Sequence, residues 1–204
     1  VQTILSTQQI AKYRAVYLIS HRPYHGIDRG RYNVIDGVAP LHIISVIEKI
    51  FNNESSGTKF DLLLGNTPPQ NADYLNPTTM EWALVSIKIM NFLASSPKVN
   101  KTIFLGSCLA LIPLFRSSTY KSIKYLEYAT YRLLYRHNKN NIKFCLLPPL
   151  TPGVSGLGKY FAEPTSRWAY KLISHFESQP TLILPDGVVG GILRLLIALD
   201  LRLR

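Results

Sequence analysis

Residues 101–147 read KTIFLGSCLALIPLFRSSTYKSIKYLEYATYRLLYRHNKNNIKFCLL. The apolar runs at 101–105 and 142–147 have the length and composition of buried strands. Between them, residues 119–137 place apolar side chains at helical spacing. A strand, a helix and a second strand in this order predict two parallel strands joined by a crossover helix.

The same alternation continues on both sides of this unit. We expect helices over 1–13, 40–51, 78–94, 166–176 and from 188 onward, and strands over 15–20, 32–37, 60–64 and 181–184. Near-continuous apolar strands such as Leu62-Leu63-Leu64 are typical of a sheet covered on both faces. The predicted fold class is therefore α/β, a doubly wound parallel sheet in a three-layer α/β/α arrangement.

The composition fits one globular domain over residues 1–204. Hydrophobic residues make up 47% and charged residues 17%, which excludes a disordered chain and a polytopic membrane protein. Cys108 and Cys145 lie in apolar runs without a CxxC motif, and the five histidines show no metal-binding spacing. This pattern favours a reduced, cytoplasmic protein without a metal site.

The net charge is +11, from 23 Lys and Arg against 12 Asp and Glu. Such a charge favours an anionic partner such as nucleic acid, a lipid surface or a phosphorylated cofactor, but ordinary solvated surface is an equal alternative because the basic residues are spread along the chain. The terminal segment 188–204 is amphipathic, and Arg194 and Asp200 interrupt its apolar run well short of the ~20 residues that span a membrane. It is predicted to lie on a membrane surface or to dock a partner, with both alternatives open.

One group of residues has the chemistry of a proton-transfer site. In parallel α/β sheets, ligands bind beyond the carboxyl ends of the strands, where Ser107 lies. Tyr120 and Lys124 follow on the next helix, four residues apart and therefore on one face. An ammonium near a phenol favours the phenolate and lowers its pKa from ~10 towards neutrality. A serine hydroxyl can hold a substrate oxygen while the tyrosine gives or takes its proton.

These three residues resemble the short-chain dehydrogenase/reductase family, in which a strand ending in Ser is followed at this spacing by a YxxxK motif. The resemblance implies a Rossmann-like domain and an oxidoreductase that interconverts a carbonyl and an alcohol by hydride transfer. Tyr120 would be the general acid/base, Ser107 would position the substrate oxygen, and Lys124 would lower the pKa of Tyr120 and hold the cofactor ribose.

Further segments are similar to the cofactor-binding parts of that family. "RYNVIDG" resembles the strand whose Asp supports the adenine, "FDLLLGNTPP" the strand before its NNAG segment, and "IKFCLLPPLTPGVSG" the strand before its PG loop. The resemblance implies cofactor contacts from Asp36, Asn66, Pro149 and Thr151. Arg22 stands where a basic residue favours a 2′-phosphate, which predicts NADP(H), with NAD(H) as the alternative.

The chain also departs from the family. Residues 1–14 align with the helix that follows the glycine-rich dinucleotide loop, so the first strand and the GxxxGxG motif are absent from this sequence. Either an upstream segment supplies them, or the chain is a divergent, non-catalytic scaffold or assembly subunit. The expected partners are a small carbonyl or alcohol substrate and a second copy of the chain, while nucleic acid is not expected because the aromatics form no recognised stacking motif.

A tyrosine stripe continues along the helix beyond the YxxxK motif. It consists of Tyr125, Tyr128, Tyr131 and Tyr135. In the family, this helix packs at a two-fold interface, so the resemblance implies a dimer contact. Packing of the tyrosines in the core of one chain is the alternative.

Overall fold

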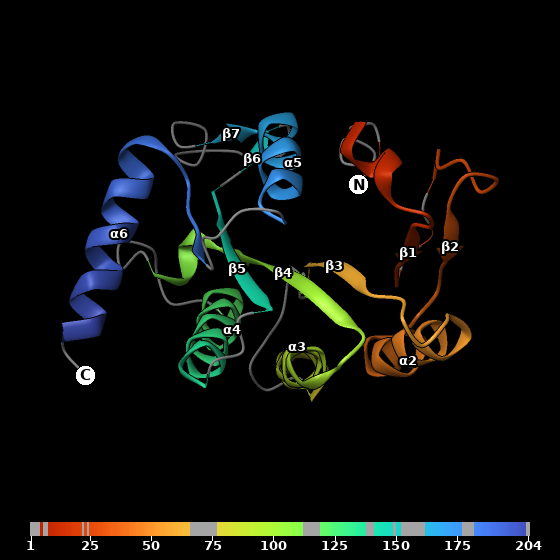
Figure 1. Ribbon diagram of the computed structural model, residues 1–204. Helices are drawn as coiled ribbons and strands as arrows, with labels where there is room; N and C mark the ends of the chain where they lie inside the picture. Colours follow the sequence, from red (N-terminus) through yellow and green to blue (C-terminus); the bar gives the residue numbers. More distant parts are fainter. Residues whose placement is uncertain are drawn as a thin grey trace.

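The computed structural model describes residue 5 and residues 8–21, 23, 25–65, 77–111, 119–137, 141–148, 150–151, 162–176 and 182–202. Helices and parallel strands alternate along these ranges, as Figure 1 shows.

The centre of the molecule is a four-stranded parallel sheet. Its strands lie in the order β3 (Phe60–Gly65), β4 (Val99–Ser107), β5 (Ile142–Leu147) and β8 (Leu182–Ile183). Every neighbouring pair is parallel. The carboxyl ends of the four strands therefore lie at one edge of the sheet.

Helices cover both faces of this sheet. In Figure 1, α2 (Ile43–Asn53), α3 (Pro77–Ser95) and α4 (Thr119–Arg136) lie below the sheet, and α5 (Thr165–Ser174) lies above it. α6 (Gly187–Arg202) lies beyond β8. The two faces have separate apolar clusters, one built on α2, α3 and α4 and the other on α5. The predicted α/β class and its doubly wound parallel sheet are confirmed.

The strand β5 shows why the sheet needs cover on both sides. Phe144 faces α4, where its ring is stacked at 5.3 Å between centroids on Tyr131 and meets Tyr128 edge-on at 5.9 Å. The next residue, Cys145, belongs to the cluster under α5, where Trp168 packs. Successive side chains of a strand point to opposite faces of the sheet. Because Phe144 and Cys145 both have 0% exposure, both faces of the sheet are covered at β5. Tyr128 and Tyr131 are thus core residues, as the packing alternative predicted.

A second, two-stranded sheet lies on the β3 side of the molecule in Figure 1. It consists of β1 (Tyr17–Ile19) and β2 (Asn33–Ile35), paired in parallel. Two tyrosine hydroxyls tie this region to the rest of the chain: Tyr13 donates to Asp61 of β3 at 2.9 Å, and Tyr17 donates to Glu54 after α2 at 2.9 Å.

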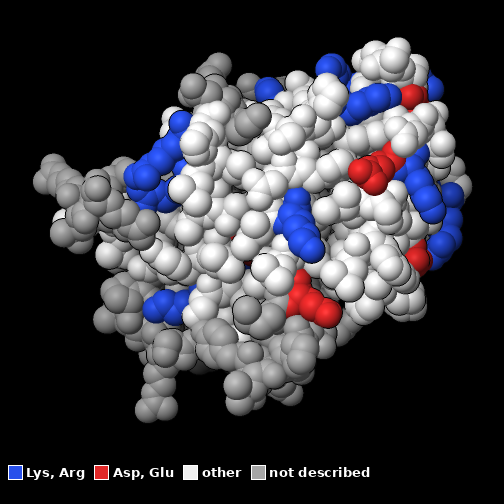
Figure 2. All heavy atoms as spheres, turned by 90° about the horizontal axis from the view of Figure 1, so that it is seen from below, with Lys and Arg blue, Asp and Glu red and all other residues white. Residues whose placement is uncertain are grey.

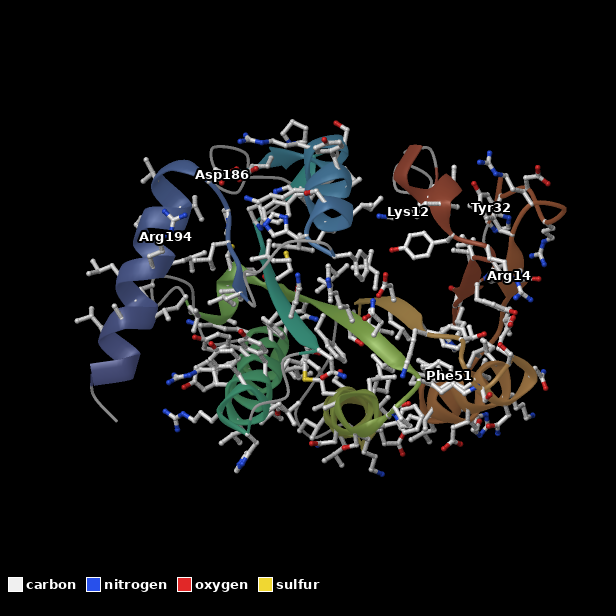
Figure 3. All side chains as sticks on the ribbon, viewed as in Figure 1. Lys12, Arg14, Tyr32, Phe51, Asp186 and Arg194 are labelled. Atoms are coloured by element: carbon white, nitrogen blue, oxygen red, sulfur yellow. The ribbon has the colours of Figure 1, made fainter. Side chains whose placement is uncertain are left out.

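Packing of α2 on the central sheet uses aromatic rings. Phe51, labelled in Figure 3, comes from the last turn of α2, and its ring centroid lies 4.6 Å from that of Phe60 in β3. Lys98, just before β4, donates to three backbone carbonyls at the end of α2, those of Phe51, Glu54 and Ser55. An ammonium at this position suits the negative end of the helix dipole.

The remaining elements are short. They are the 3₁₀ helices η1 (Gln8–Lys12), η2 (Pro40–His42) and η3 (Cys108–Ala110), and a pair of two-residue strands, β6 (Leu150–Thr151) and β7 (Glu163–Pro164). In the segment 1–13, where a helix was expected, Leu5 is α-helical and residues 8–12 form the 3₁₀ helix η1. The terminal helix expected from 188 begins at Gly187 and continues to Arg202.

Charge is scattered over the helical face of the molecule. Figure 2 shows this face, where some of the described Lys and Arg side chains stand alone among neutral residues and others lie beside Asp and Glu side chains at the right-hand edge. α6 exposes an apolar row made of Val188, Ile192, Leu195 and Leu199. Within the described ranges, no helix has the length and apolar character that crossing a membrane requires.

Candidate active site

The candidate site begins where β4 ends. The backbone of Ser107 is still extended, and the chain then turns directly into η3. The Ser107 Oγ accepts a hydrogen bond from the backbone N–H of Leu109 at 3.3 Å, which caps this turn. Ser107 is buried. Its side chain is therefore fixed at the carboxyl edge of the sheet.

Gly106 sets the position of this strand end. A Cβ built at Gly106 would lie 2.3 Å from Cε1 of Phe144 and 2.5 Å from its Cζ. Carbon atoms in van der Waals contact lie ~3.5–4.0 Å apart, so only glycine lets the Phe144 ring pack against β4 here. The core residue Phe144 and the site residue Ser107 are thus positioned by one close contact.

Tyr120 comes from the first turn of α4, and its phenol interacts with Ser107. Burial raises the pKa of Tyr120 above its ordinary value, and a hydrogen bond from Ser107 acts in the opposite direction. The charge of Glu127 and the neighbouring Cys108 raise the pKa further. Burial also raises the pKa of the Cys108 thiol, to about 11. The phenol of Tyr120 is therefore protonated at neutral pH.

Lys124 lies one turn further along α4. Its Nζ is 5.8 Å from the centroid of the Tyr120 ring, and the residue is only 2% exposed. The spacing of four residues places the two side chains on one face of α4, as the sequence predicts. The structure thus brings together Ser107, Tyr120 and Lys124.

Sequence reasoning missed a further member of this cluster, Glu127. Its Oε2 lies 2.9 Å from Nζ of Lys124, and its Oε1 accepts a hydrogen bond from the hydroxyl of Ser86 in α3, also at 2.9 Å. The spacing of three residues from Lys124 is a signal for such a pair on a helix. Ser86 lies 41 residues away in the sequence, and only the packing of α3 on α4 reveals it.

The expected cofactor residues are only partly described. Asp36 follows β2 directly, and its carboxylate is paired with the guanidinium of Arg29. Thr151 lies in β6, but its side chain is outside the described part of the chain. Arg22, Asn66 and Pro149 also lie outside the described residues.

Within the described ranges, no group of three or more His, Cys, Asp and Glu side chains could hold a metal ion. What the site contains is a hydroxyl, a phenol and a buried ammonium with its carboxylate. This set can hold a carbonyl or alcohol oxygen and exchange a proton with it.

Comparison with known families and with curated proteins finds no match. Among solved structures, the fold resembles that of a provisionally assigned short-chain alcohol dehydrogenase from Burkholderia multivorans. The sequence identity is 13% and the TM-score is 0.50, over 87% of this chain and 89% of the other. At this identity the likeness concerns the fold alone: the chain is similar to that protein in its α/β architecture.

Proposed function

We propose that the protein is an oxidoreductase that interconverts a carbonyl and an alcohol with a nicotinamide cofactor. The observation that carries the proposal is the cluster of buried Ser107, half-buried Tyr120 and buried Lys124 beside the carboxyl end of β4. The likeness in fold to the Burkholderia multivorans protein, described as a short-chain alcohol dehydrogenase, supports it.

Each residue has a defined part in the proton chemistry. Ser107 donates a hydrogen bond to the substrate oxygen and positions it against the phenol. Tyr120, protonated at neutral pH, gives its proton to that oxygen when a carbonyl is reduced and accepts one when an alcohol is oxidised. Lys124 places a positive charge beside the phenolate that remains after the proton has left.

The proposal includes a dinucleotide bound beyond the carboxyl ends of the parallel strands, where α/β folds of this kind bind their ligands. Ser107 ends β4 of the central sheet, Asp36 follows β2 of the two-stranded sheet, and Thr151 lies in β6. When bound, the reduced nicotinamide supplies the hydride. We propose NADP(H), held by Arg22 at its 2′-phosphate, with NAD(H) as the alternative.

The test is the variant Tyr120→Phe, with Tyr135→Phe as its control. Tyr135 lies on the same helix, and 48% of it is exposed. Removing the phenol hydroxyl should lower kcat/KM for NADPH-dependent reduction of a panel of simple aldehydes and ketones by about 100-fold or more, because general acid catalysis contributes that much. The control should keep full activity. Equal activity of the two variants would remove Tyr120 from the mechanism.

A non-catalytic scaffold is the second candidate. The observation in its favour is that Lys124, the residue expected to hold the ribose, is buried and paired with Glu127. Calorimetric titration with NADPH separates the two functions, since a scaffold that has lost its cofactor site releases no heat of binding. The oxidoreductase proposal includes a cytoplasmic location and self-association through the exposed apolar residues Leu126 and Leu133 of α4.

A further inference from the structure

We propose that Glu127 is a positioning residue of the candidate active site, which fixes the Lys124 ammonium and limits how far this cation can ionise Tyr120. The inference rests on the proposed function and deepens it, because it concerns the direction of the reaction. A site that keeps its phenol protonated is adapted to carbonyl reduction at neutral pH.

The geometry places Glu127 between two helices. Its carboxylate binds Lys124 of its own helix through one oxygen and Ser86 of α3 through the other, both at 2.9 Å. The side chains of Lys124 and Glu127 are 3% and 5% exposed. Both oxygens of the carboxylate are thus held, and they hold the ammonium in turn.

A contribution to the stability of the fold is a weak explanation for the ion pair of Lys124 and Glu127. A buried ion pair loses the hydration of both charges, and replacing it with apolar residues of similar volume is often neutral or stabilising. The pair does affect the charge near Tyr120: the ammonium and the carboxylate together add no net charge beside its phenol. An ammonium alone would favour the phenolate, and the carboxylate offsets that effect.

Among the described residues, the groups near the phenol come from four elements. They are Ser107 of β4, Cys108 of η3, and Lys124 and Glu127 of α4, with Ser86 of α3 behind Glu127. The thiol is neutral at physiological pH, because burial raises the pKa of Cys108 to about 11. At that pH the negative charge among these groups is that of Glu127, which raises the pKa of the phenol, as ionisation of Cys108 would.

The test measures the ionisation of Tyr120 in the protein without cofactor or substrate. An ultraviolet titration of phenolate absorbance is recorded for the native protein and Tyr120→Phe, and the difference gives the pKa of Tyr120. The same difference is then measured between Glu127→Gln and the double variant Glu127→Gln/Tyr120→Phe. Glutamine keeps the size and hydrogen-bonding capacity of the side chain and removes its charge.

We expect the pKa of Tyr120 to fall by about one unit or more in Glu127→Gln, since one charge nearby has an effect of that size. Glu48→Gln, on the exposed surface of α2, should leave it unchanged. An unchanged Tyr120 titration in a folded Glu127→Gln protein would overturn the proposal. The measurement involves no turnover, so it is independent of the activity test of the proposed function.

A second variant decides the question if Glu127→Gln does not fold. In Lys124→Met/Glu127→Met both charges are replaced by apolar side chains of similar length, a change that buried pairs commonly tolerate. If the pair acts as a neutral unit, the pKa of Tyr120 stays within about half a unit of the native value. A rise of more than about one unit would show that the lysine alone governs the phenol, and would refute the role of Glu127.

Discussion

The variant Gly106→Ala tests whether one close contact positions both the core and the candidate site. The added Cβ would lie 2.3 Å and 2.5 Å from two ring carbons of Phe144, and 3.3 Å from the carbonyl oxygen of Cys145. Because carbon atoms pack at ~3.5–4.0 Å, the ring would have to withdraw by more than about 1 Å.

The Phe144 ring has little room to withdraw. It has 0% exposure and is stacked on Tyr131 at 5.3 Å, with Tyr128 at 5.9 Å on its edge. Overpacking a filled core costs about 1–3 kcal/mol, and we expect the upper part of this range because the methyl group meets a ring that is held on two sides. For a domain of this size, such a loss lowers the Tm by about 5–10 °C.

Urea unfolding followed by circular dichroism measures this loss, and Gly191→Ala is the control. Gly191 lies in α6, where an added Cβ has no atom within 4 Å. Alanine there should leave stability unchanged or raise it by up to about 1 kcal/mol. Both substitutions restrict the unfolded chain in the same way, so the difference between them isolates the clash.

A double variant, in which the Phe144 ring is also replaced by a smaller side chain, decides whether the clash is the cause. Phe144→Leu should be less harmful in the Gly106→Ala background than alone, by about 1 kcal/mol or more, because the smaller side chain makes room for the methyl group. Strict additivity of the two substitutions, or a Gly106→Ala protein as stable as Gly191→Ala, would refute the reasoning.

Two further predictions concern charged groups away from the site. Lys98→Met removes the ammonium bound by three backbone carbonyls after α2 and should lower the free energy of unfolding by about 1–3 kcal/mol, whereas Lys88→Met, at an exposed position, should change it by less than about 0.5 kcal/mol. Asp186, labelled in Figure 3, accepts a hydrogen bond from Lys171, and this bond together with the charge of Arg167 holds the pKa of Asp186 below its usual value. A carboxyl group whose pKa is lowered by folding stabilises the fold at pH values above its pKa in the unfolded chain, ~3.9. This contribution is lost as the pH falls through the lower pKa of the folded protein. Asp186→Asn should therefore lose less than about 1 kcal/mol at neutral pH, because half of this side chain is exposed, and nothing near pH ~2; a loss that persists in acid would contradict the assignment.

The central sheet could be predicted because its strands are buried on both faces. The apolar run at 142–147 corresponds to β5, Ile142–Leu147, and the helix expected over 78–94 to α3, Pro77–Ser95. Continuous apolar runs and helical spacing record burial directly in the sequence. The strands β6 and β7 could not be predicted in this way, because each has only two residues and is defined by its pairing with the other.

The site was predictable to the extent that it is local in the sequence. Tyr120 and Lys124 share a helix face by their spacing alone, and Ser107 ends the preceding strand. Glu127 lies on the same helix, yet its meaning depends on Ser86 of another helix. Residues whose role depends on a partner from a distant element are the ones that sequence spacing does not identify.

The net charge of +11 is partly explained by lysines that bind the backbone of the chain itself. Lys143 of β5 donates to the carbonyl of His175 and Lys101 of β4 to that of Phe176, so two ammonium groups meet the carboxyl end of α5. Lys98 likewise donates to backbone carbonyls at the carboxyl end of α2. Burial lowers the pKa of Lys143, and the neighbouring Lys101 adds to this effect. Cations that complement helix ends need no anionic partner, so the net charge by itself is a weaker argument for nucleic acid or lipid binding than the composition indicated.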